Sequence, residues 1–374
     1  MKKKIIILPG DGIGKEVTTE GKKVLEKIAS LFDHQFEFEE GLIGHDAIEA
    51  TGVPLPDETL HQLRNCDAIL FGAVGHPKYD NDPTLKVRPE QGLLKMRKEL
   101  GLYANLRPIK LFDELLEASS IKSEILKGSD ILFFRELTGD VYFGEKGRKD
   151  GGNTAYDVMI YQRFEIERIA HKAFQAARTR KKKVTSVDKA NVLESSRLWR
   201  EVVQEIGKQY PDVQLEHQFV DSAAMKLIQN PRSFDVVLTG NLFGDILTDE
   251  ASQIAGSMGM LASASVGDTV GLYEPIHGSA HDITGKGIAN PLASILSASL
   301  LLDISFGLKK ESDTVIKAVE QTLKQGYRTA DIADSKSAKA KILSTRDMGQ
   351  HVVGQIEQLR DGKVLNKTSF TTAG

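Results

Sequence analysis

The sequence predicts an α/β fold built around a largely parallel β-sheet. Short apolar runs, most of them rich in Ile, Val, Leu or Phe, alternate along the chain with segments of helical periodicity. The runs that we interpret as buried strands are residues 4–8, 68–71, 130–134, 184–187 and 236–238. A length of 374 residues fits two domains or one large one, at roughly 150 residues per domain.

The N-terminal elements follow this alternation. The run at residues 4–8 leads into a glycine turn at residues 10–14, and a helical segment extends to about Phe32. Residues 35–39 alternate apolar and polar side chains, as a half-exposed strand does. The glycine spacing is GxGxG rather than GxGxxG, and Lys15 precedes Glu16 rather than Ser or Thr. The turn therefore matches neither a dinucleotide fingerprint nor a kinase-type phosphate loop, and alone it indicates a tight strand–helix connection.

The later elements are equally regular. Apolar residues at helical spacing predict an amphipathic helix over residues 166–177, followed by a solvated basic loop at 178–183. Residues 215–220 have the pattern of a strand. The apolar stretch 291–306 contains several serines and Asp303, so it predicts a buried helix rather than a membrane span. The residues after Lys363 are expected to be loosely held.

Composition excludes several classes of protein. Lys and Arg number 49 against 52 Asp and Glu, a net charge of −3, so no basic excess indicates a nucleic-acid or membrane surface. The single cysteine, Cys66, excludes an internal disulfide and a cysteine-based zinc site, and we expect it to pack as a small buried residue. The basic start is followed by an apolar run too short for a signal peptide, so we expect a cytoplasmic location.

A first group of candidate residues is suited to an anionic ligand. Glu90, Leu93, Leu94 and Arg97 have the spacing of one helix face, with two leucines between a carboxylate and a guanidinium. Arg107 and Arg135 lie in or after apolar runs, where a cation needs an anionic partner. Three such arginines can hold a substrate with two carboxylates, but internal salt bridges explain them equally well.

A second group is acidic. Asp245 and Asp249 are four residues apart, so they point the same way from one helix, among apolar neighbours that argue against a solvated acidic face. Two adjacent carboxylates repel each other unless a cation lies between them. Asp221, which follows a strand, is a candidate third ligand. An all-oxygen set favours Mg²⁺ or Mn²⁺ over zinc.

Further candidates lie at strand ends and in a loop. Lys189 follows a strand, where open α/β sheets place ligands, and it is a candidate proton-transfer group; Tyr142 is a candidate acid. Each is also compatible with an ordinary surface or packing role. Residues 277–290 form a glycine-rich polar loop suited to a polar ligand. Asp282 there is suited to a ribose diol and repels a 2′-phosphate, which favours NAD over NADP, unless it only caps a turn.

Taken together, these motifs resemble the metal-dependent β-decarboxylating dehydrogenases of the isocitrate/isopropylmalate dehydrogenase family. The resemblance covers nearly the whole chain, from the glycine turn to about residue 360, and its motifs occur in order. They are RPEQGLLKMR at 88–97, YANLRP at 103–108, RELTGDVY at 135–142, DKANVL at 188–193, GNLFGDILTD at 240–249 and YEPIHGSA at 273–280. Lys15 and His281 depart from the pattern, since each stands where proline is expected.

The resemblance implies a two-domain α/β fold of the isocitrate/isopropylmalate dehydrogenase type, with a cleft between the domains, rather than the usual Rossmann fold. It implies an NAD-binding domain at 1–102 plus 256–374, and a substrate, metal and dimerisation domain at 103–255 with an arm near 138–155. It also implies a homodimer in which the residues matching Lys189 and Asp221 serve the partner's active site.

The resemblance assigns a role to each candidate. Tyr142 and Lys189 are expected to be catalytic, and Asp221, Asp245 and Asp249 to bind Mg²⁺ or Mn²⁺. The expected substrate contacts are Glu90, Leu93, Leu94, Arg97, Arg107, Arg135 and Asp221. The expected NAD contacts are Ile13, Glu274, His277, Gly278, Ser279, Ala280, Asp282, Ile283 and Asn290.

The expected reaction is NAD-dependent oxidative decarboxylation of (2R,3S)-3-isopropylmalate to 2-oxo-4-methylpentanoate and CO₂, a step of leucine biosynthesis. Leu93 and Leu94 offer an apolar wall to an isopropyl group and disfavour the third carboxylate of isocitrate. Two alternatives stay open: a D-malate or tartrate dehydrogenase, and a non-catalytic regulatory subunit. The second is disfavoured because every expected catalytic and metal-binding residue is present.

Overall fold

The computed structural model describes residues 1–80, 82, 84–334 and 341–360. The expected loose segment after Lys363 lies outside these residues. The chain divides into two compact units, Met1–Leu93 with Gly271–Gly374, and Leu94–Val270. The bounds expected from sequence, 102/103 and 255/256, both fall inside the second unit. Among the described residues, no helix has the length and apolar character needed to cross a membrane.

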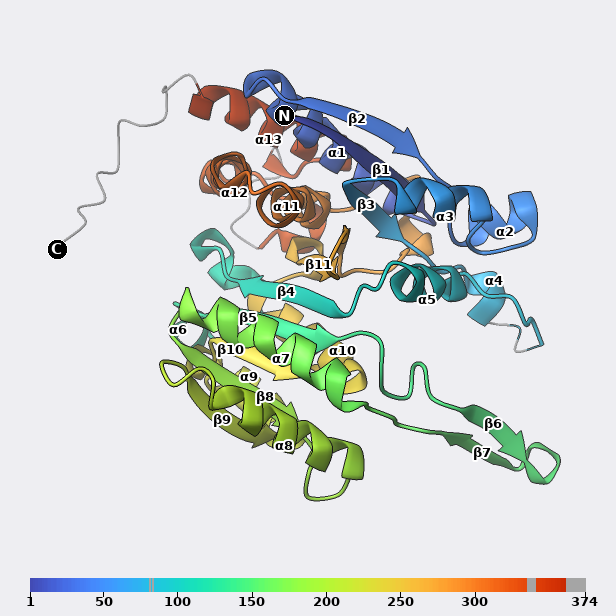
Figure 1. Ribbon diagram of the computed structural model, residues 1–374. Coiled ribbons are helices and arrows are strands. Elements are labelled where there is room, and N and C mark those ends of the chain that lie inside the picture. The colour runs from blue at the N-terminus through green and yellow to red at the C-terminus, as the bar shows by residue number, and fades with distance from the viewer. Residues whose placement is uncertain (81, 83, 335–340, 361–374) are drawn as a thin grey trace. The chain divides into compact units, whose positions relative to one another are not determined.

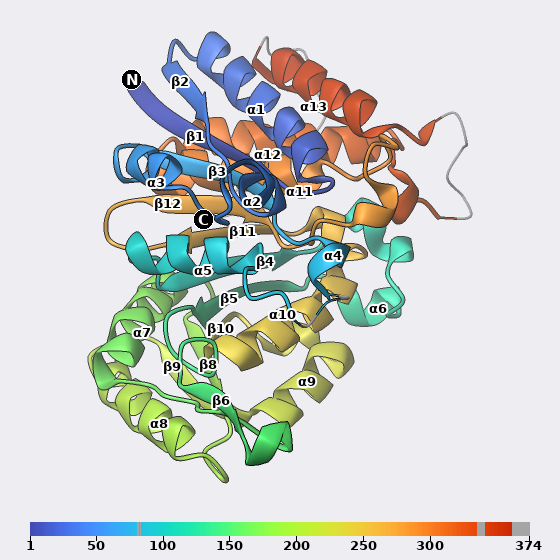
Figure 2. The same cartoon turned by 90° about the vertical axis from the view of Figure 1, so that its right-hand side faces the viewer.

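The first unit contributes four parallel strands, in the order β2–β1–β3–β12, to a ten-stranded sheet, and helices cover them (Figures 1 and 2). The apolar runs of β1 and β3 are completely buried, which explains why they lack the alternation of β2. Helix α1 packs against α11 and α13, and α12 packs against α13. Its strands are β1 (Lys2–Gly10), β2 (Gln35–Glu40), β3 (Ala68–Ala73) and β12 (Gly271–Pro275).

The helices of this unit include the buried one expected near 291–306, which is formed by α11 and the π-helical turn after it. They are α1 (Gly14–Leu31), α2 (His45–Thr51), α3 (Asp57–Arg64), α4 (Pro77–Asp80), η5 (His281–Ile283), α11 (Leu292–Leu300), η6 (Leu301–Ser305), α12 (Lys309–Lys324), η7 (Ala330–Ile332) and α13 (Thr345–Arg360). Helix α5 (Glu90–Glu99) spans the junction between the two units.

The second unit contains strands in the order β11–β4–β5–β10–β8–β9. The pairs β11–β4 and β4–β5 are antiparallel, and the others are parallel. Figures 1 and 2 show α7 and α8 on one face of these strands and α9 and α10 on the other. The strands are β4 (Ala104–Lys110), β5 (Asp130–Glu136), β8 (Lys183–Asp188), β9 (Gln214–Phe219), β10 (Val236–Thr239) and β11 (Ala262–Val266).

The longer helices of this unit are α7 (Arg163–Arg178), α8 (Glu194–Gly207), α9 (Val220–Gln229) and α10 (Asn241–Ala255). Shorter ones are η1 (Asp113–Ala118), α6 (Ser123–Leu126), η3 (Pro231–Ser233) and η4 (Met258–Met260). Helix α7 contains the amphipathic helix predicted over 166–177 and buries its apolar face. The basic run that follows is largely exposed, as predicted, although Arg180 is half-buried between Asp130 and Asp235.

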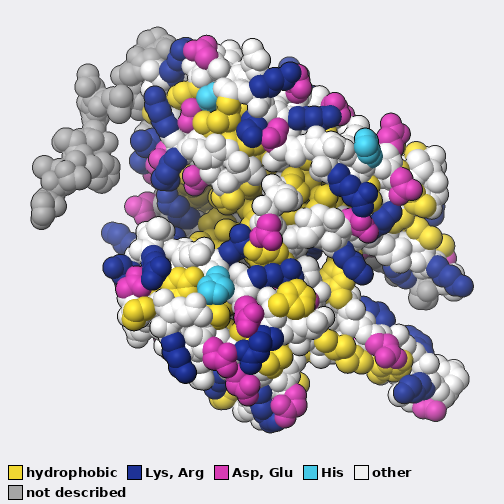
Figure 3. All heavy atoms as spheres, viewed as in Figure 1, with side chains coloured by type: hydrophobic (Ala, Val, Ile, Leu, Met, Phe, Trp, Pro, Cys, Tyr) yellow, Lys and Arg dark blue, Asp and Glu magenta, His cyan; other side chains and the backbone are white. Residues whose placement is uncertain are grey.

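An antiparallel hairpin projects from the second unit as an arm (Figure 1). It consists of β6 (Lys146–Lys149), the turn η2 (Asp150–Gly152) and β7 (Thr154–Asp157), with Lys146 opposite Asp157. Hydrophobic side chains are visible on the surface along the arm in Figure 3, and Val158 and Ile160, just after β7, are exposed. An exposed hairpin with apolar side chains is typical of a surface that pairs with another chain.

Candidate active site

Two buried arginines of the second unit lie on one face of neighbouring strands. Arg135 on β5 is paired directly with Asn105 on β4, and Arg107 lies two residues beyond Asn105. Since side chains alternate along a strand, all three point to the same face. Arg135 is 2% exposed and Arg107 is 7% exposed. Cations this deeply buried require anionic or strongly accepting partners.

Helix α10 provides those partners. Arg135 forms an ion pair with Asp245. The Arg107 guanidinium lies between two carboxylates, with Nη2 at 3.7 Å from Asp245 Oδ1 and Nη1 at 3.7 Å from Asp249 Oδ1. Gly244 permits this approach, because a Cβ there would lie 2.7 Å from Arg135 Cγ. The structure thus brings the two aspartates and two of the arginines together, and the salt-bridge and ligand-binding interpretations of these arginines are compatible.

Electrostatics distinguish the two aspartates. Burial acts to raise the pKa of Asp245, but the charge of Arg135 and a hydrogen bond from Tyr142 outweigh it and hold that pKa below its usual value. Burial raises the pKa of Asp249, the positive charge of Arg107 opposes this effect, and the neighbouring Asp245 carboxylate adds to it. A divalent cation between them would relieve the repulsion and favour ionisation of both.

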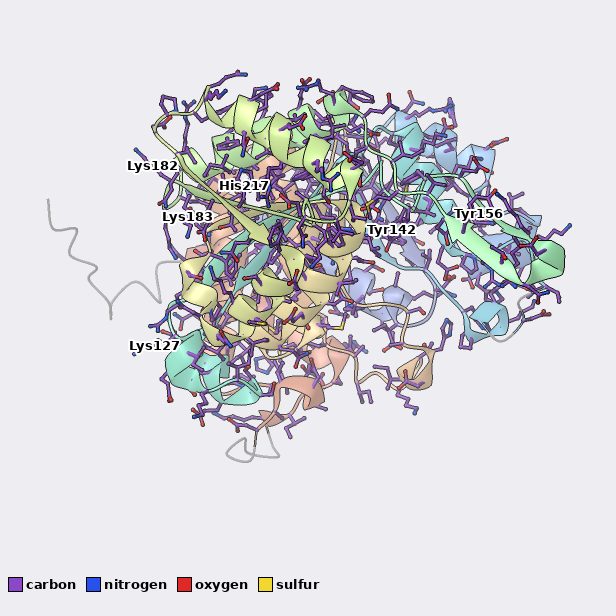
Figure 4. All side chains as sticks on the ribbon, turned by 90° about the horizontal axis from the view of Figure 1, so that it is seen from below. Lys127, Tyr142, Tyr156, Lys182, Lys183 and His217 are labelled. Carbon is purple, nitrogen blue, oxygen red and sulfur yellow. The ribbon has the colours of Figure 1, made fainter. Side chains whose placement is uncertain are left out.

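Tyr142 lies against the same aspartate. Its hydroxyl donates a hydrogen bond of 2.6 Å to Asp245 Oδ2, and the Arg135 guanidinium carbon lies 5.5 Å from the centre of its ring. Burial and the Asp245 carboxylate raise the pKa of Tyr142, so the phenol keeps its proton at neutral pH. Figure 4 shows Tyr142 near the root of the arm and Tyr156 on it. Tyr142 is therefore a protonated phenol that donates a hydrogen bond among the charged residues.

Lys189 and Asp221 form a second group. Strands β8 and β9 are parallel with Asp188 opposite Phe219, so the residues that follow both strands emerge side by side. Lys189 forms an ion pair with Asp221 in the first turn of α9, and this bond lowers the pKa of the carboxyl. Among the described residues of this single chain, no three His, Cys, Asp or Glu side chains are grouped closely enough to hold a metal. One chain therefore supplies the Asp245–Asp249 pair and, separately, the Lys189–Asp221 pair.

Helix α5 carries the remaining residues of the predicted anion-binding group. Arg97 is buried, and its charge contributes to the low pKa of Asp245, which locates it near the other arginines. Leu93 and Leu94 are half-buried, and Glu90 is exposed at the start of the helix. The spacing predicted from sequence, with two leucines between Glu90 and Arg97 on one helix, is the spacing of α5.

In the first unit, the glycine turn at residues 10–14 is hydrogen-bonded to the polar loop at residues 277–290. The Ile13 amide donates to the Ser279 carbonyl at 2.9 Å, and a Cβ on Gly12, whose φ is +57°, would lie 2.0 Å from that oxygen. Ile13, Val17 and Ala289 form a small apolar cluster against which Ala280 and Ile283 pack. Three of the residues predicted to contact NAD, namely Ile13, Ala280 and Ile283, are thus brought together.

The other predicted cofactor residues differ in their surroundings. Asp282 and Gly278 are exposed, and Glu274 is buried at the end of β12. Burial lowers the pKa of His277, so its ring is neutral at pH 7. Asn290 has structural partners, since its amide donates to Asp331 at 3.0 Å and its oxygen accepts the Leu292 amide at 3.0 Å.

Lys15 and His281, the two residues that depart from the family pattern, also have ion-pair or hydrogen-bond partners. Lys15 forms an ion pair with Asp46. His281 Nε2 lies 2.7 Å from the Gly75 carbonyl and donates to it, while the His281 ring meets the edge of His76 at 4.5 Å between centroids. Asp11, inside the glycine turn, accepts the amides of His45 and Gly75 at 2.9 Å each. These contacts tie the loops around the turn together.

The comparisons with known proteins agree with this arrangement. The model of the isocitrate/isopropylmalate dehydrogenase family matches residues 4–352. The chain belongs to that family. It is 59% identical over 337 residues to a 3-isopropylmalate dehydrogenase of Shouchella clausii, covering 89% of this chain and 92% of the relative. It is 53% identical to a 3-isopropylmalate dehydrogenase of Aquifex aeolicus, covering 96% and 99%.

Solved structures give the same result. An isocitrate dehydrogenase from Methylococcus capsulatus superposes with a TM-score of 0.83 at 32% identity, covering 95% of this chain and all of that one. A β-decarboxylating dehydrogenase from Thermococcus kodakarensis superposes with a TM-score of 0.77 at 36% identity, covering 98% and 100%. The predicted fold class and the assignment to an oxidoreductase family are confirmed.

Sequence reasoning missed several polar residues that complete the site. Asn105, Asn241 and Thr248 contact the guanidinium groups of Arg107 or Arg135, and Asp140 and Tyr161 contact the start of α10. A signal existed for Asn105, because it precedes Arg107 by two residues and so shares its strand face. For the others, no local pattern indicates the contact, since it depends on how α10 packs.

Proposed function

We propose that this protein catalyses the NAD-dependent oxidative decarboxylation of (2R,3S)-3-isopropylmalate to 2-oxo-4-methylpentanoate and CO₂, a step of leucine biosynthesis in the cytoplasm. The observation that carries the proposal is the meeting of buried Arg107 and Arg135 with Asp245, Asp249 and a protonated Tyr142 in one unit. This set combines anion binding, a cation site and a proton donor. The high identity to proteins named 3-isopropylmalate dehydrogenase supports the choice of substrate.

The donor set fits a hard divalent cation. Asp245 and Asp249 are carboxylates one helix turn apart; burial raises the pKa of Asp249, and the charge of Asp245 adds to that rise. Asp221, from the partner subunit, would complete an all-oxygen set suited to Mg²⁺ or Mn²⁺. When bound, the ion lowers the pKa of the substrate hydroxyl and stabilises negative charge on its oxygen. The 277–290 loop and the glycine turn would hold NAD⁺, which would supply the hydride acceptor for C2.

The chain's own residues perform the remaining work. Arg97, Arg107 and Arg135 bind the two carboxylates of the substrate, for which the guanidinium fork is geometrically suited. Lys189, through a water or a neighbouring aspartate, accepts the proton of the C2 hydroxyl as hydride leaves. After CO₂ is lost from the carboxylate on C3, Tyr142 protonates C3. Its raised pKa keeps that proton available until carbanion character develops at this carbon.

Substrate choice depends on Leu93 and Leu94. Their half-buried side chains suit an isopropyl group. The third carboxylate of isocitrate would lose its hydration against them and face Glu90, which is expected to reject it strongly. A single methyl-sized contact gives only about 1–3 kcal/mol of discrimination, so D-malate and tartrate are rejected less strongly.

The functional unit is a homodimer. Within one chain, Lys189 and Asp221 pair with each other rather than with the Asp245–Asp249 pair. Large apolar side chains are exposed on α9 and α10, which pack together: Met225 is 60% exposed and Ile246 is 59% exposed. Covering this surface with a second copy buries the apolar side chains and brings the partner's Lys189 and Asp221 to the site.

A substrate panel tests the proposed function. The purified protein is assayed for NADH formation with Mg²⁺ and 3-isopropylmalate, isocitrate, D-malate or tartrate, with NADP⁺ and EDTA as controls. The expected result is turnover of isopropylmalate with NAD⁺ that EDTA abolishes and Mg²⁺ or Mn²⁺ restores. Higher kcat/KM with D-malate or tartrate would overturn the substrate assignment, and the absence of any turnover would favour a regulatory subunit.

A further inference from the structure

Two asparagine side chains hold the two strand arginines of the site by their Nε edges. Asn105 is completely buried, and its Oδ1 accepts a hydrogen bond of 2.7 Å from Arg107 Nε. Its Nδ2 donates to Ser263 Oγ at 2.7 Å and to Ser265 Oγ at 3.0 Å. A guanidinium can only donate, so its position fixes which end of the Asn105 amide faces it.

Asn241 does the same for the second arginine. It is 2% exposed, and its Oδ1 accepts from Arg135 Nε at 3.1 Å and from Nη2 at 2.8 Å. Its backbone carbonyl also accepts from Nε at 2.9 Å. The amide is anchored behind, since Nδ2 donates to the Gly139 carbonyl at 3.3 Å and the backbone N–H donates to Tyr161 Oη at 2.7 Å.

The outer ends of the guanidinium groups have partners of their own, among them Thr248, whose hydroxyl accepts a hydrogen bond from Arg107 Nη1. A guanidinium has five N–H donors, and the asparagines use those on the Nε side. The terminal nitrogens point toward α10, where Nη1 of Arg135 pairs with Asp245 and Arg107 lies 3.7 Å from each aspartate. The Nη pair is the edge that binds a carboxylate through two parallel hydrogen bonds.

The acceptors on the Nε side are neutral. A carboxylate at either position would hold the arginine equally well, but it would also cancel the positive charge. In a buried environment that cancellation is large, because charges interact strongly where the effective dielectric constant is low. An amide oxygen orients the guanidinium without adding a further negative charge to those of Asp245 and Asp249.

We propose that Asn105 and Asn241 are positioning residues for the substrate: neutral acceptors that orient Arg107 and Arg135 without consuming their charge. This inference rests on the proposed function, in which these arginines bind a dicarboxylate. It adds that the neutrality of the two asparagines, and not only their hydrogen bonding, determines affinity for the substrate.

The test exchanges the amide for a carboxylate of the same shape. Asn105→Asp keeps the oxygen beside Arg107 Nε, and the hydroxyls of Ser263 and Ser265 can turn to donate, so the variant is expected to fold with an unchanged unfolding temperature. The KM for isopropylmalate should rise about tenfold or more, as expected for the loss of one charge-assisted contact. The KM for NAD⁺ should stay within about twofold, because its binding residues lie elsewhere.

A matched control separates orientation from packing. Ser265→Ala removes one hydroxyl that Asn105 bonds but keeps the Asn105–Arg107 contact, so its KM for isopropylmalate should remain near that of the unchanged protein. Asn241→Asp repeats the charge test at Arg135 and should also raise that KM. Asn105→Asp and Asn241→Asp variants that fold normally and keep the original KM would overturn the inference.

A binding measurement keeps this inference distinct from the proposed function. If the unchanged protein turns over no isopropylmalate, the proposed function fails, and calorimetric titration with isopropylmalate then replaces the kinetic readout. Binding that weakens about tenfold in Asn105→Asp and is unchanged in Ser265→Ala supports the positioning role. Equal binding by all three proteins contradicts it.

Discussion

Removing one oxygen atom from Tyr142 separates its catalytic role from its structural role. In Tyr142→Phe, the 2.6 Å hydrogen bond to Asp245 is lost, while the ring and its contact with Arg135 are kept. A hydrogen bond to a charged acceptor contributes about 1.5–3 kcal/mol when buried. Because Asp245 is 38% exposed, solvent screening reduces the expected loss in unfolding free energy to about 1 kcal/mol.

The effect on catalysis should be larger. A positioned general acid typically contributes about 10²–10⁴-fold in rate, equivalent to about 3–5 kcal/mol of activation free energy. Because Tyr142 acts after hydride transfer, the variant should still produce one rapid turnover of NADH before the steady state slows. Stopped-flow absorbance measures that burst, and urea unfolding measures stability.

Tyr103→Phe is the matched control, because Tyr103 also donates to a carboxylate, Asp268 at 3.1 Å, in the same unit. It should lose similar stability and keep kcat within about threefold, since no reacting atom is involved. Steady-state turnover by Tyr142→Phe within threefold of the unchanged protein, or a loss no larger than that of Tyr103→Phe, would refute the assignment of Tyr142 as the acid.

Three further outcomes are expected. When the inactive variants Lys189→Ala and Tyr142→Phe are dissociated, mixed and reassociated, about a quarter of the original activity should return. Half of the dimers then contain one subunit of each variant, and each of these mixed dimers holds one intact active site out of two. No recovery of activity would contradict active sites that are shared between subunits. Leu94→Ala should lower kcat/KM for isopropylmalate by about tenfold or more and for D-malate by much less, and equal losses would exclude an apolar-wall role. The free energy of unfolding should fall as pH decreases below about 6.5. Burial lowers the pKa of His217, so below this pH the unfolded chain binds more protons than the folded one. In urea titrations at several pH values, His217→Gln should flatten the pH dependence of the free energy of unfolding, and an unchanged slope would refute the prediction.

The histidine prediction depends on a residue that the sequence alone does not single out. His217 on β9 (labelled in Figure 4) has both ring nitrogens buried without a hydrogen-bond partner, and Nδ1 lies 3.9 Å from Asp188. Its surroundings are created by the pairing of β8 with β9 and by Arg200, which bonds Asp188. A one-dimensional pattern does not contain that information.

Local patterns were sufficient where the signal is periodic. The strand at 4–8 lies within β1, the helix at 166–177 lies within α7, and Asp245 and Asp249 share a helix face because four residues make about one turn. Strand direction was not accessible in this way. The pairs β11–β4 and β4–β5 are antiparallel within an otherwise parallel set, and nothing in an isolated apolar run indicates its direction.

In the site too, residues with a local sequence signal could be predicted, and residues whose contacts depend on the fold could not. Arg107 and Arg135 were found because an arginine in an apolar run is costly without a partner. The asparagines that orient them were missed, because an asparagine has no such cost until the fold buries it. Lys189 and Asp221 were each expected to follow a strand, and the ends of β8 and β9 place them next to each other, a pairing that the sequence did not indicate.

The most direct test of the proposed reaction is the stoichiometry of its products. Purified protein is incubated with NAD⁺, Mg²⁺ and (2R,3S)-3-isopropylmalate, and NADH, CO₂ and 2-oxo-4-methylpentanoate are quantified together. Equal amounts of the three products, formed only with the metal present, are predicted. NADH without CO₂, or no NADH at all, would contradict the proposal that this site oxidises and decarboxylates the same substrate.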